Sequence, residues 1–189
     1  MKKQLIAVVL PTFLLTSLCH ADDTAPQDSF ARIRVFQQNQ IDLGLFPHRD
    51  CYRFSFTGNN GDIVESQALK SFLHLSENKS IGMPETPNTR GLAARNNFIS
   101  KAYYQEYKIP AGEITTLTAS FGDSYNKHCN TMAVKFTPQA GTDYEAMLNV
   151  DFDQEACRLV IGAIPHDNPD APLERLDHLT PASYCPDNK

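Results

Sequence analysis

Three short clusters of histidine, cysteine and aspartate contain the residues best suited to binding a metal. They are His48 with Asp50 and Cys51, His128 with Cys129, and His166 with Asp167. Protein zinc sites usually show a Cys-x-x-Cys or His-Glu-x-x-His spacing, and these clusters lack it. We therefore predict neither a metal site nor a cofactor, and we assign the cysteines to disulfides.

Ser124 is the residue most suggestive of nucleophilic catalysis. It lies in the string Phe-Gly-Asp-Ser-Tyr (residues 121–125), which resembles the nucleophile block of the GDSL hydrolases. That resemblance implies a serine that attacks an ester, an α/β fold after the block and a late Asp-x-x-His signature. Here 65 residues follow Ser124, they alternate like β-strands, and the signature is missing. A Gly-Asp-Ser turn is ordinary loop chemistry, so an envelope serine hydrolase is the alternative function.

Five carboxylates lie close together in the sequence near residue 150. Paired carboxylates could serve the hydrolysis of a glycosidic bond. A glycosidase needs two carboxylates across a sugar cleft, one of them with a raised pKa. The group consists of Asp143, Glu145, Asp151, Asp153 and Glu155. These residues fall on the polar face and the turn of one predicted hairpin, so we expect them to be solvated and not catalytic.

Residues 101–164 form the stretch around which the chain is organised. They alternate apolar and polar side chains with the two-residue period of β-strands. The predicted strands cover residues 103–109, 114–121, 131–136, 144–152 and 157–164. Proline and glycine at residues 110–112 and 138–141 predict two hairpin turns. The alternation places Tyr103 and Tyr107 on the buried face, Tyr104 on the opposite face, and Phe152 toward the core.

The N-terminal half predicts further strands at residues 30–37, 41–46 and 52–56. Residues 63–75 fit a short helix or a buried strand, and we favour a strand. Frequent turns between short strands predict an all-β fold, an antiparallel β-sandwich of about seven or eight strands stabilised by disulfides. A closed β-barrel is the alternative. The proline-rich tail, residues 165–189, is expected to wrap the body, with a helical turn near residues 173–179.

The N-terminus has the pattern of an export signal. Lys2 and Lys3 precede an apolar run, and Ala21 precedes a polar, acidic start. We predict a signal peptide at residues 1–21, removed to leave a single periplasmic domain at residues 22–189. Lipidation at Cys19 is the rival interpretation, disfavoured because Leu18 is large for that position. The apolar run is shorter than the ~20 residues of a membrane span.

Four cysteines remain after signal cleavage, and they allow three pairings. We favour Cys129–Cys157 within the central strands and Cys51–Cys185, which would tether the tail. The chain has 17 Lys and Arg against 22 Asp and Glu, a net charge of −5, which becomes −7 when Lys2 and Lys3 leave with the signal. This charge argues against a nucleic-acid partner and against an anionic membrane surface.

Several short motifs are similar to those of uncharacterised proteobacterial exported proteins and lipoproteins. They are Ile-Gly-Met-Pro (residues 81–84), Ile-Pro-Ala-Gly (residues 109–112), the run at residues 136–145 and Cys-Arg-Leu (residues 157–159). The resemblance covers residues 80–164. It implies a periplasmic β-sandwich and carries no activity. Many members look lipidated, and Leu18-Cys19 departs from that pattern.

Residues 76–100 are the candidate binding loop, because a long connection within a compact domain is often functional or mobile. A partly ordered crossover between two sheets is the equally weighted alternative. Met83, Arg90, Arg95 and Tyr104 are the candidate contact residues, since these residue types are enriched in interface cores. We expect a non-catalytic protein-binding module whose partner is another envelope protein: an inhibitor, an immunity protein or an assembly factor. A structural subunit of an envelope complex is a further alternative, and the oligomeric state stays open.

Overall fold

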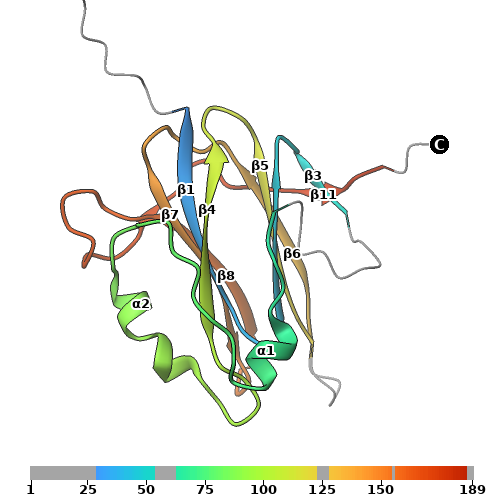
Figure 1. Ribbon diagram of the computed structural model, residues 1–189. Coiled ribbons are helices and arrows are strands. Elements are labelled where there is room, and N and C mark those ends of the chain that lie inside the picture. The colour runs from blue at the N-terminus through green and yellow to red at the C-terminus, as the bar shows by residue number, and fades with distance from the viewer. Residues whose placement is uncertain (1–28, 54–62, 123–127, 155, 187–189) are drawn as a thin grey trace, which may run out of the picture.

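The computed structural model describes residues 29–53, 63–122, 128–154 and 156–186. Within these residues the chain forms eleven strands and three short helices, and nine of the strands make up two packed sheets (Figure 1). The two larger sheets do not close on each other, so the predicted β-sandwich is confirmed. The predicted signal peptide, Cys19, Ser124 and Glu155 lie outside the described residues.

The first sheet has five strands. In spatial order they are β4 (Tyr103–Pro110), β1 (Phe30–Gln37), β7 (Asp143–Asp151), β8 (Ala156–Ala163) and β9 (Glu174–Arg175). Its pairs are antiparallel except for β1 with β7, which run parallel. The sheet lies on the left in Figure 1.

The second sheet has four antiparallel strands and lies on the right in Figure 1. In spatial order they are β10 (Thr180–Pro181), β6 (His128–Phe136), β5 (Thr115–Gly122) and β2 (Ile41–Pro47). A separate parallel pair joins β3 (Cys51–Tyr52) to β11 (Ser183–Tyr184). Of the strand expected at residues 52–56, residues 54–56 lie outside the described part of the chain.

The core lies between the two sheets and consists of the side chains that the alternation placed there. Fully buried members include Ile33, Val35, Leu43, Leu45, Ile109, Leu117, Ala146 and Leu148. Tyr103 and Tyr107 face inward as predicted, with exposed fractions of 2% and 8%. Phe152 does not face inward: it is 49% exposed, and its ring packs against that of Phe121 in a T-shaped arrangement.

The turns at residues 110–112 and 138–141 are present, but neither joins a hairpin. Gly112 and Gly141 adopt φ values of 77° and 71°, which glycine tolerates without strain. However, β4 pairs with β1 and β5 pairs with β2 and β6, so each turn carries the chain from one sheet to the other. The hairpin prediction was therefore wrong, because alternation identifies strands and turns and does not specify which strands pair.

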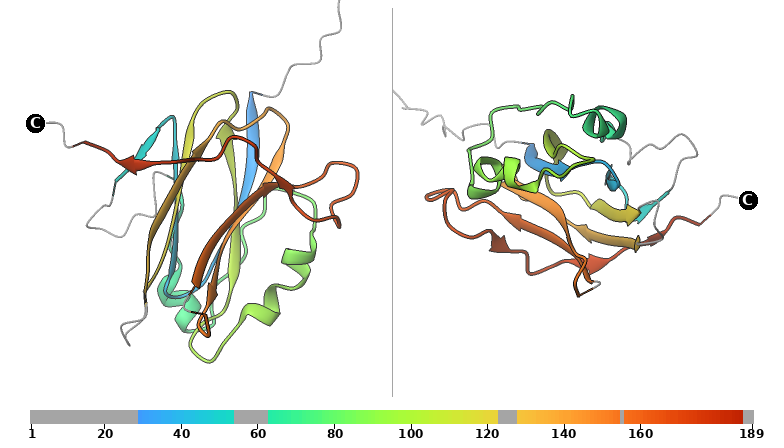
Figure 2. Two further views of the ribbon diagram at one scale, coloured as in Figure 1. Left: turned by 180° about the vertical axis from the view of Figure 1, so that it is seen from behind. Right: turned by 90° about the horizontal axis from the view of Figure 1, so that it is seen from below.

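The three helices lie outside the sandwich. They are α1 (Ala68–Phe72), α2 (Pro87–Arg90) and the 3₁₀ helix η1 (Leu92–Arg95). The strand that we favoured for residues 63–75 was wrong, since α1 forms there at the lower end of the sandwich (Figure 1). Residues 76–100, which we call the covering segment, pass over the outer face of the five-stranded sheet (Figures 1 and 2).

The tail wraps the body, as predicted. It forms β9, β10 and β11 in turn and ends in the Cys51–Cys185 disulfide, and the second disulfide is Cys129–Cys157. Both favoured pairings are thus confirmed. The helical turn expected near residues 173–179 does not form, since β9 occupies residues 174–175 and a non-helical turn follows at residues 177–178. In the chain-entropy model, closing the longer loop stabilises the fold by about 4–5 kcal/mol.

Candidate functional site

Three charged side chains meet on the outer face of the five-stranded sheet. Arg34 on β1 is directly opposite Glu106 on β4 and Glu145 on β7 in the strand register. Its Nε and Nη2 donate to Glu106 Oε1 at 2.9 and 2.6 Å, and its Nη1 donates to Glu145 Oε1 at 2.6 Å. All three side chains are at most 1% exposed. We call this group the buried charge network.

The covering segment supplies the remaining hydrogen bonds of the network. Glu106 Oε2 accepts from the Ser80 hydroxyl and from the N–H groups of Ile81 and Met83, at 2.6–3.2 Å. Glu145 accepts from the Thr86 hydroxyl and the Asn88 side-chain amide, both at 2.7 Å. Every carboxylate oxygen is therefore engaged, and none faces an open space where a substrate could bind.

The pKa of Glu106 reflects this enclosure. Burial alone would raise it, but the hydrogen bonds from the Ile81 N–H, Arg34, Ser80 and the Met83 N–H outweigh burial and lower the pKa below its usual value. The carboxylate therefore stays ionised at neutral pH. We expected Asp143 and Glu145 to be solvated, and this was wrong. The covering segment excludes water from Glu145, and the Asp143 side chain, paired with Arg32, is only 12% exposed.

A second ion pair follows along the same strands. Arg32 binds Asp143 through two hydrogen bonds of 2.6 Å, and its Nη1 donates to the Gly82 carbonyl at 3.1 Å. Arg34 Nη2 likewise donates to the Pro84 carbonyl at 2.9 Å. The two arginines of β1 therefore bind both the neighbouring strands and the covering segment. The outer face of the five-stranded sheet thus serves to stabilise the fold.

The four candidate contact residues have different surroundings. Met83 is buried, and Tyr104 is half-buried with the Arg34 guanidinium 5.1 Å from its ring centre. Arg95 donates to the Leu148 carbonyl and to Asn149 Oδ1, and burial lowers its pKa. Arg90 is exposed and pairs with Asp170 of the tail. Of the four, Arg90 is the one whose charged group is most open to a partner.

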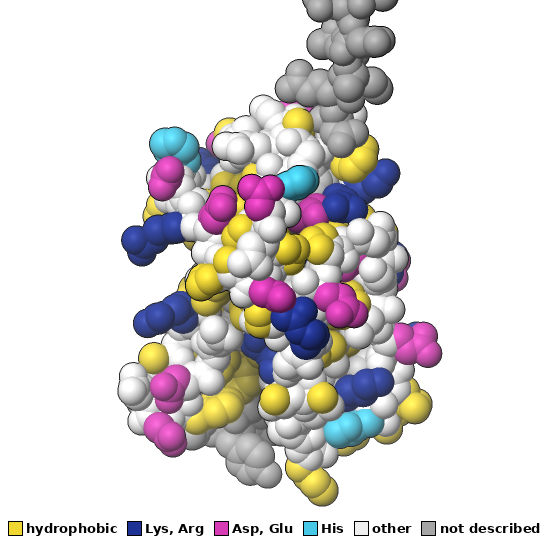
Figure 3. Space-filling model, turned by 90° about the vertical axis from the view of Figure 1, so that its left-hand side faces the viewer, with side chains coloured by type: hydrophobic (Ala, Val, Ile, Leu, Met, Phe, Trp, Pro, Cys, Tyr) yellow, Lys and Arg dark blue, Asp and Glu magenta, His cyan; other side chains and the backbone are white. Residues whose placement is uncertain are grey.

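A different region exposes apolar side chains, and sequence reasoning did not find it. Five large apolar residues near α1 and in the turn after η1 are at least half exposed: Leu69 (72%), Phe72 (50%), Leu73 (53%), Leu75 (64%) and Phe98 (97%). We call these five side chains the apolar end. Hydrophobic side chains project from the lower end of the face shown in Figure 3. Most soluble monomers leave only small apolar patches exposed, and a larger one marks an interaction site.

Buried serines hold the two segments of the apolar end together. Ser71 Oγ and Ser100 Oγ lie 3.1 Å apart, and both accept the Asn39 N–H, at 2.7 and 2.9 Å. The Lys101 N–H donates to the Ser71 carbonyl at 3.0 Å. The Gln67 N–H donates to the Tyr103 hydroxyl at 3.0 Å, which ties the start of α1 to β4. The exposed residues therefore stand on an anchored base.

The charge around the apolar end differs from that of the whole chain. Residues 66–76 and 95–102 contain Lys70, Arg95 and Lys101 and no aspartate or glutamate, although Glu65 and Glu77 directly flank the first range and the whole chain has a net charge of −5. Lys101 uses its ammonium group to donate to the Ser76 carbonyl. Lys70 on α1 is exposed next to Leu69, so an acidic group on a partner surface would complement it.

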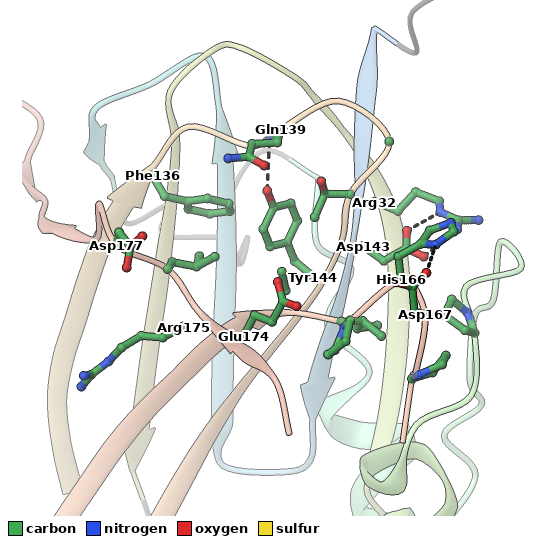
Figure 4. A pocket seen from close by; sticks show the side chains of 18 of the residues that line it. Arg32, Phe136, Gln139, Asp143, Tyr144, His166, Asp167, Glu174, Arg175 and Asp177 are labelled. Atoms are coloured by element: carbon green, nitrogen blue, oxygen red, sulfur yellow. Dashed lines mark hydrogen bonds and ion pairs between the residues drawn. The ribbon is translucent and has the colours of Figure 1, made fainter. Parts of the chain in front are cut away.

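A cavity of about 1090 Å³ lies at the opposite end, between the sandwich and the tail. Figure 4 shows Phe136 and Tyr144 at its floor, where their rings meet edge to face at 5.4 Å. The Arg32–Asp143 pair and the pair of His166 with Asp167 lie to one side. The side chains of His166 and Asp167 are almost fully exposed, so this cavity is an open, solvated depression.

The clusters that suggested metal chemistry are not assembled into a site. His48 pairs with Glu113, while Cys51 and Cys129 are in disulfides. Within the described ranges, no three His, Cys, Asp or Glu side chains come together in a way that could hold a metal. None of the helices described has both the length and the hydrophobicity to span a membrane.

Comparison with known proteins adds no assignment. The chain matches no protein-family model, no curated protein and no solved structure. The fold and its two disulfides define the chain as a disulfide-bonded antiparallel β-sandwich. Disulfides of this kind fit an oxidising compartment outside the cytoplasm.

Proposed function

We propose that this protein is a periplasmic protein-binding module without catalytic activity, which holds another envelope protein through the apolar end. The observation that carries the proposal is the exposure of Leu69, Phe72, Leu73, Leu75 and Phe98 on two adjacent, anchored segments. Exposed leucine and phenylalanine side chains on an ordered base gain free energy when a partner removes them from water.

The partner we infer presents an apolar pocket with an acidic rim. Lys70 would meet that rim, and the apolar side chains would fill the pocket. Arg90, with its exposed guanidinium on the covering segment, is a candidate for a peripheral contact. The resemblance to exported proteins at residues 80–164 is compatible with this role, and it supplies no partner.

The test uses the oxidised mature protein, immobilised and exposed to a bacterial envelope extract, with bound proteins quantified by mass spectrometry. The Leu69→Ser/Phe72→Ser protein is the test variant. The Ile114→Ser protein is the matched control, because Ile114 is 43% exposed in the turn after β4, at the other end of the sandwich. We expect one stoichiometric partner that binds the wild type and the control and is lost from the double variant.

Binding of the purified partner then decides the chemistry. We expect its affinity to fall with rising salt, since opposite charges surround the contact. Retained binding by the double variant would refute the apolar end as the contact surface. Binding to phosphatidylglycerol vesicles, lost in the same variant, would replace the protein partner with a lipid surface. A protein that is degraded unless its partner is present would be a structural subunit, whereas an inhibitor is stable alone.

A further inference from the structure

The five-stranded sheet has an incompletely covered edge along β8. Its last strand, β9, pairs only with Gly162 and Ala163 of β8. The tail then leaves this edge and joins β6 through β10. In the part of the chain that the structure describes, no strand pairs with residues 157–161 on the side away from β7. An open strand edge is a template for pairing with another strand.

The direction of the free backbone groups follows from one hydrogen bond. The Ile164 N–H donates to the Asp143 carbonyl at 2.8 Å, so the even-numbered residues of this strand direct their backbone groups toward β7. Backbone groups alternate in direction along a strand. The N–H and C=O groups of Cys157, Leu159 and Ile161 therefore point to the open edge.

The side chains beside this edge are apolar and only partly covered. Cys157 and Leu159 pack against the core while remaining half-buried, as do Met132 and Val134 on β6 across the sandwich. The Cys129–Cys157 disulfide joins the two sheets at this side. A strand added next to β8 would shield Leu159 and satisfy the open backbone groups at once.

We propose that β8 pairs in antiparallel fashion with β8 of a second copy of this chain, around a two-fold axis at Leu159. In this register Cys157 faces Ile161 of the other copy, and the backbone groups of all three edge-directed residues find partners. The pairing covers residues 157–161 and stops where β9 begins, at Gly162. In this register the edge-directed residues of one copy come opposite the edge-directed residues of the other, over the whole uncovered stretch.

The outer-face side chains fit the same register. Arg158 lies opposite Val160 of the other copy. The two arginines therefore do not face each other, and the repulsion between like charges on opposite strands is avoided. A symmetric contact of this kind is the commonest way in which a chain forms a dimer. The contact is small, and we expect a weak, concentration-dependent dimer. It lies on a different surface from the apolar end and does not depend on the proposed function.

The test is sedimentation equilibrium of the oxidised mature protein at concentrations up to about 1 mM, with two opposite variants of one half-exposed residue. Val160→Glu places a carboxylate opposite each Arg158, and Val160→Arg places a second cation there. We expect the first variant to tighten and the second to weaken the dimer, each by roughly tenfold. Both variants lose the same valine, so a packing defect would move them in the same direction.

Amide hydrogen exchange gives the residue-specific readout. Dimerisation should slow exchange at Cys157, Leu159 and Ile161 and leave Arg158 and Val160 unchanged. A protein that is monomeric throughout the concentration range would overturn the proposal, as would equal effects of the two variants. A dimer that persists in Val160→Arg and disappears in Leu69→Ser/Phe72→Ser would place the contact at the apolar end, and would likewise refute pairing through β8.

Discussion

The outer face of the five-stranded sheet and the apolar end depart from the usual distribution of residues in opposite directions. On the sheet, an arginine and two glutamates are at most 1% exposed. At the apolar end, leucine and phenylalanine side chains are 50–97% exposed. The charged face carries a covering segment, whereas the described residues place nothing over the apolar end. Whether a side chain is buried in this protein therefore depends on whether another segment of the chain covers its surface, and not on whether the side chain is polar or apolar.

The contrast also separates stability from recognition. The buried network holds one positive and two negative charges, and it is compensated by hydrogen bonds from five groups of the covering segment. Its disruption should damage the fold. The five side chains of the apolar end are at least half exposed, so their removal should affect binding and leave the fold intact. The following variants test this division.

The largest effect is expected from Arg34→Met. The substitution leaves two buried carboxylates without their cation, and breaking a buried ion pair in this way costs about 3–5 kcal/mol of unfolding free energy. Denaturant unfolding measures the loss. Arg90→Met is the control, because its ion pair with Asp170 is exposed and should contribute less than about 1 kcal/mol. Equal losses in the two variants would contradict the structural role of the network.

The second-largest effect is expected at alkaline pH, which should weaken the contact between α1 and β4 at Tyr103. Burial raises the pKa of Tyr103 to about 12, with Asp42 and Tyr107 adding to the effect, although the Gln67 N–H opposes it. Because the pKa in the folded state is above the ordinary value of about 10, this stabilisation is complete below pH 10 and is lost as pH rises toward 12.

Absorbance at 295 nm and circular dichroism, recorded together, measure this transition. We expect Tyr103 and Tyr107 to ionise late, together with the loss of structure, because burial raises the pKa of both. In Tyr103→Phe one of these two late ionisations should be missing. Ionisation of every tyrosine near pH 10 in the intact fold would show that Tyr103 is accessible to water.

A smaller loss is expected from Ser71→Ala. The Ser71 hydroxyl accepts the Asn39 N–H and donates to the Lys101 carbonyl at 2.8 Å in a fully buried position. Its removal should lower the unfolding free energy by about 1–2 kcal/mol. The exposed Ser66→Ala is the control and should change stability by less than about 0.5 kcal/mol. A neutral Ser71→Ala would mean that the apolar end is held by other contacts.

The smallest effect on stability is expected from Leu69→Ser/Phe72→Ser. Both side chains are at least half exposed, so the unfolding free energy should change by less than about 0.5 kcal/mol per site. Thermal and denaturant unfolding check this. A loss of several kcal/mol would show that these residues are covered in solution, and the comparison between the two regions would fail.

Local sequence determined much of the fold. Alternation located β4 to β8 and the inward faces of Tyr103 and Tyr107, because the two-residue period is a property of the extended backbone. Turn chemistry located the positive-φ glycines at 112 and 141. The four cysteines outside the predicted signal peptide indicated two disulfides, and the structure bears out the favoured pairing.

Tertiary structure decided which strands pair and which faces meet water. The polar positions of β1, β4 and β7 looked solvated, and only the passage of residues 76–100 across them buries Arg34, Glu106 and Glu145. The sequence contained one indication of this buried network: a strand with an Arg-x-Arg pattern could pair with the glutamates on the polar faces of two other strands. Strand pairing depends on contacts between residues far apart in the chain, and the local alternation of side chains does not specify those contacts. For the same reason the exposure of Leu69 and Phe72 could be seen only in the folded molecule.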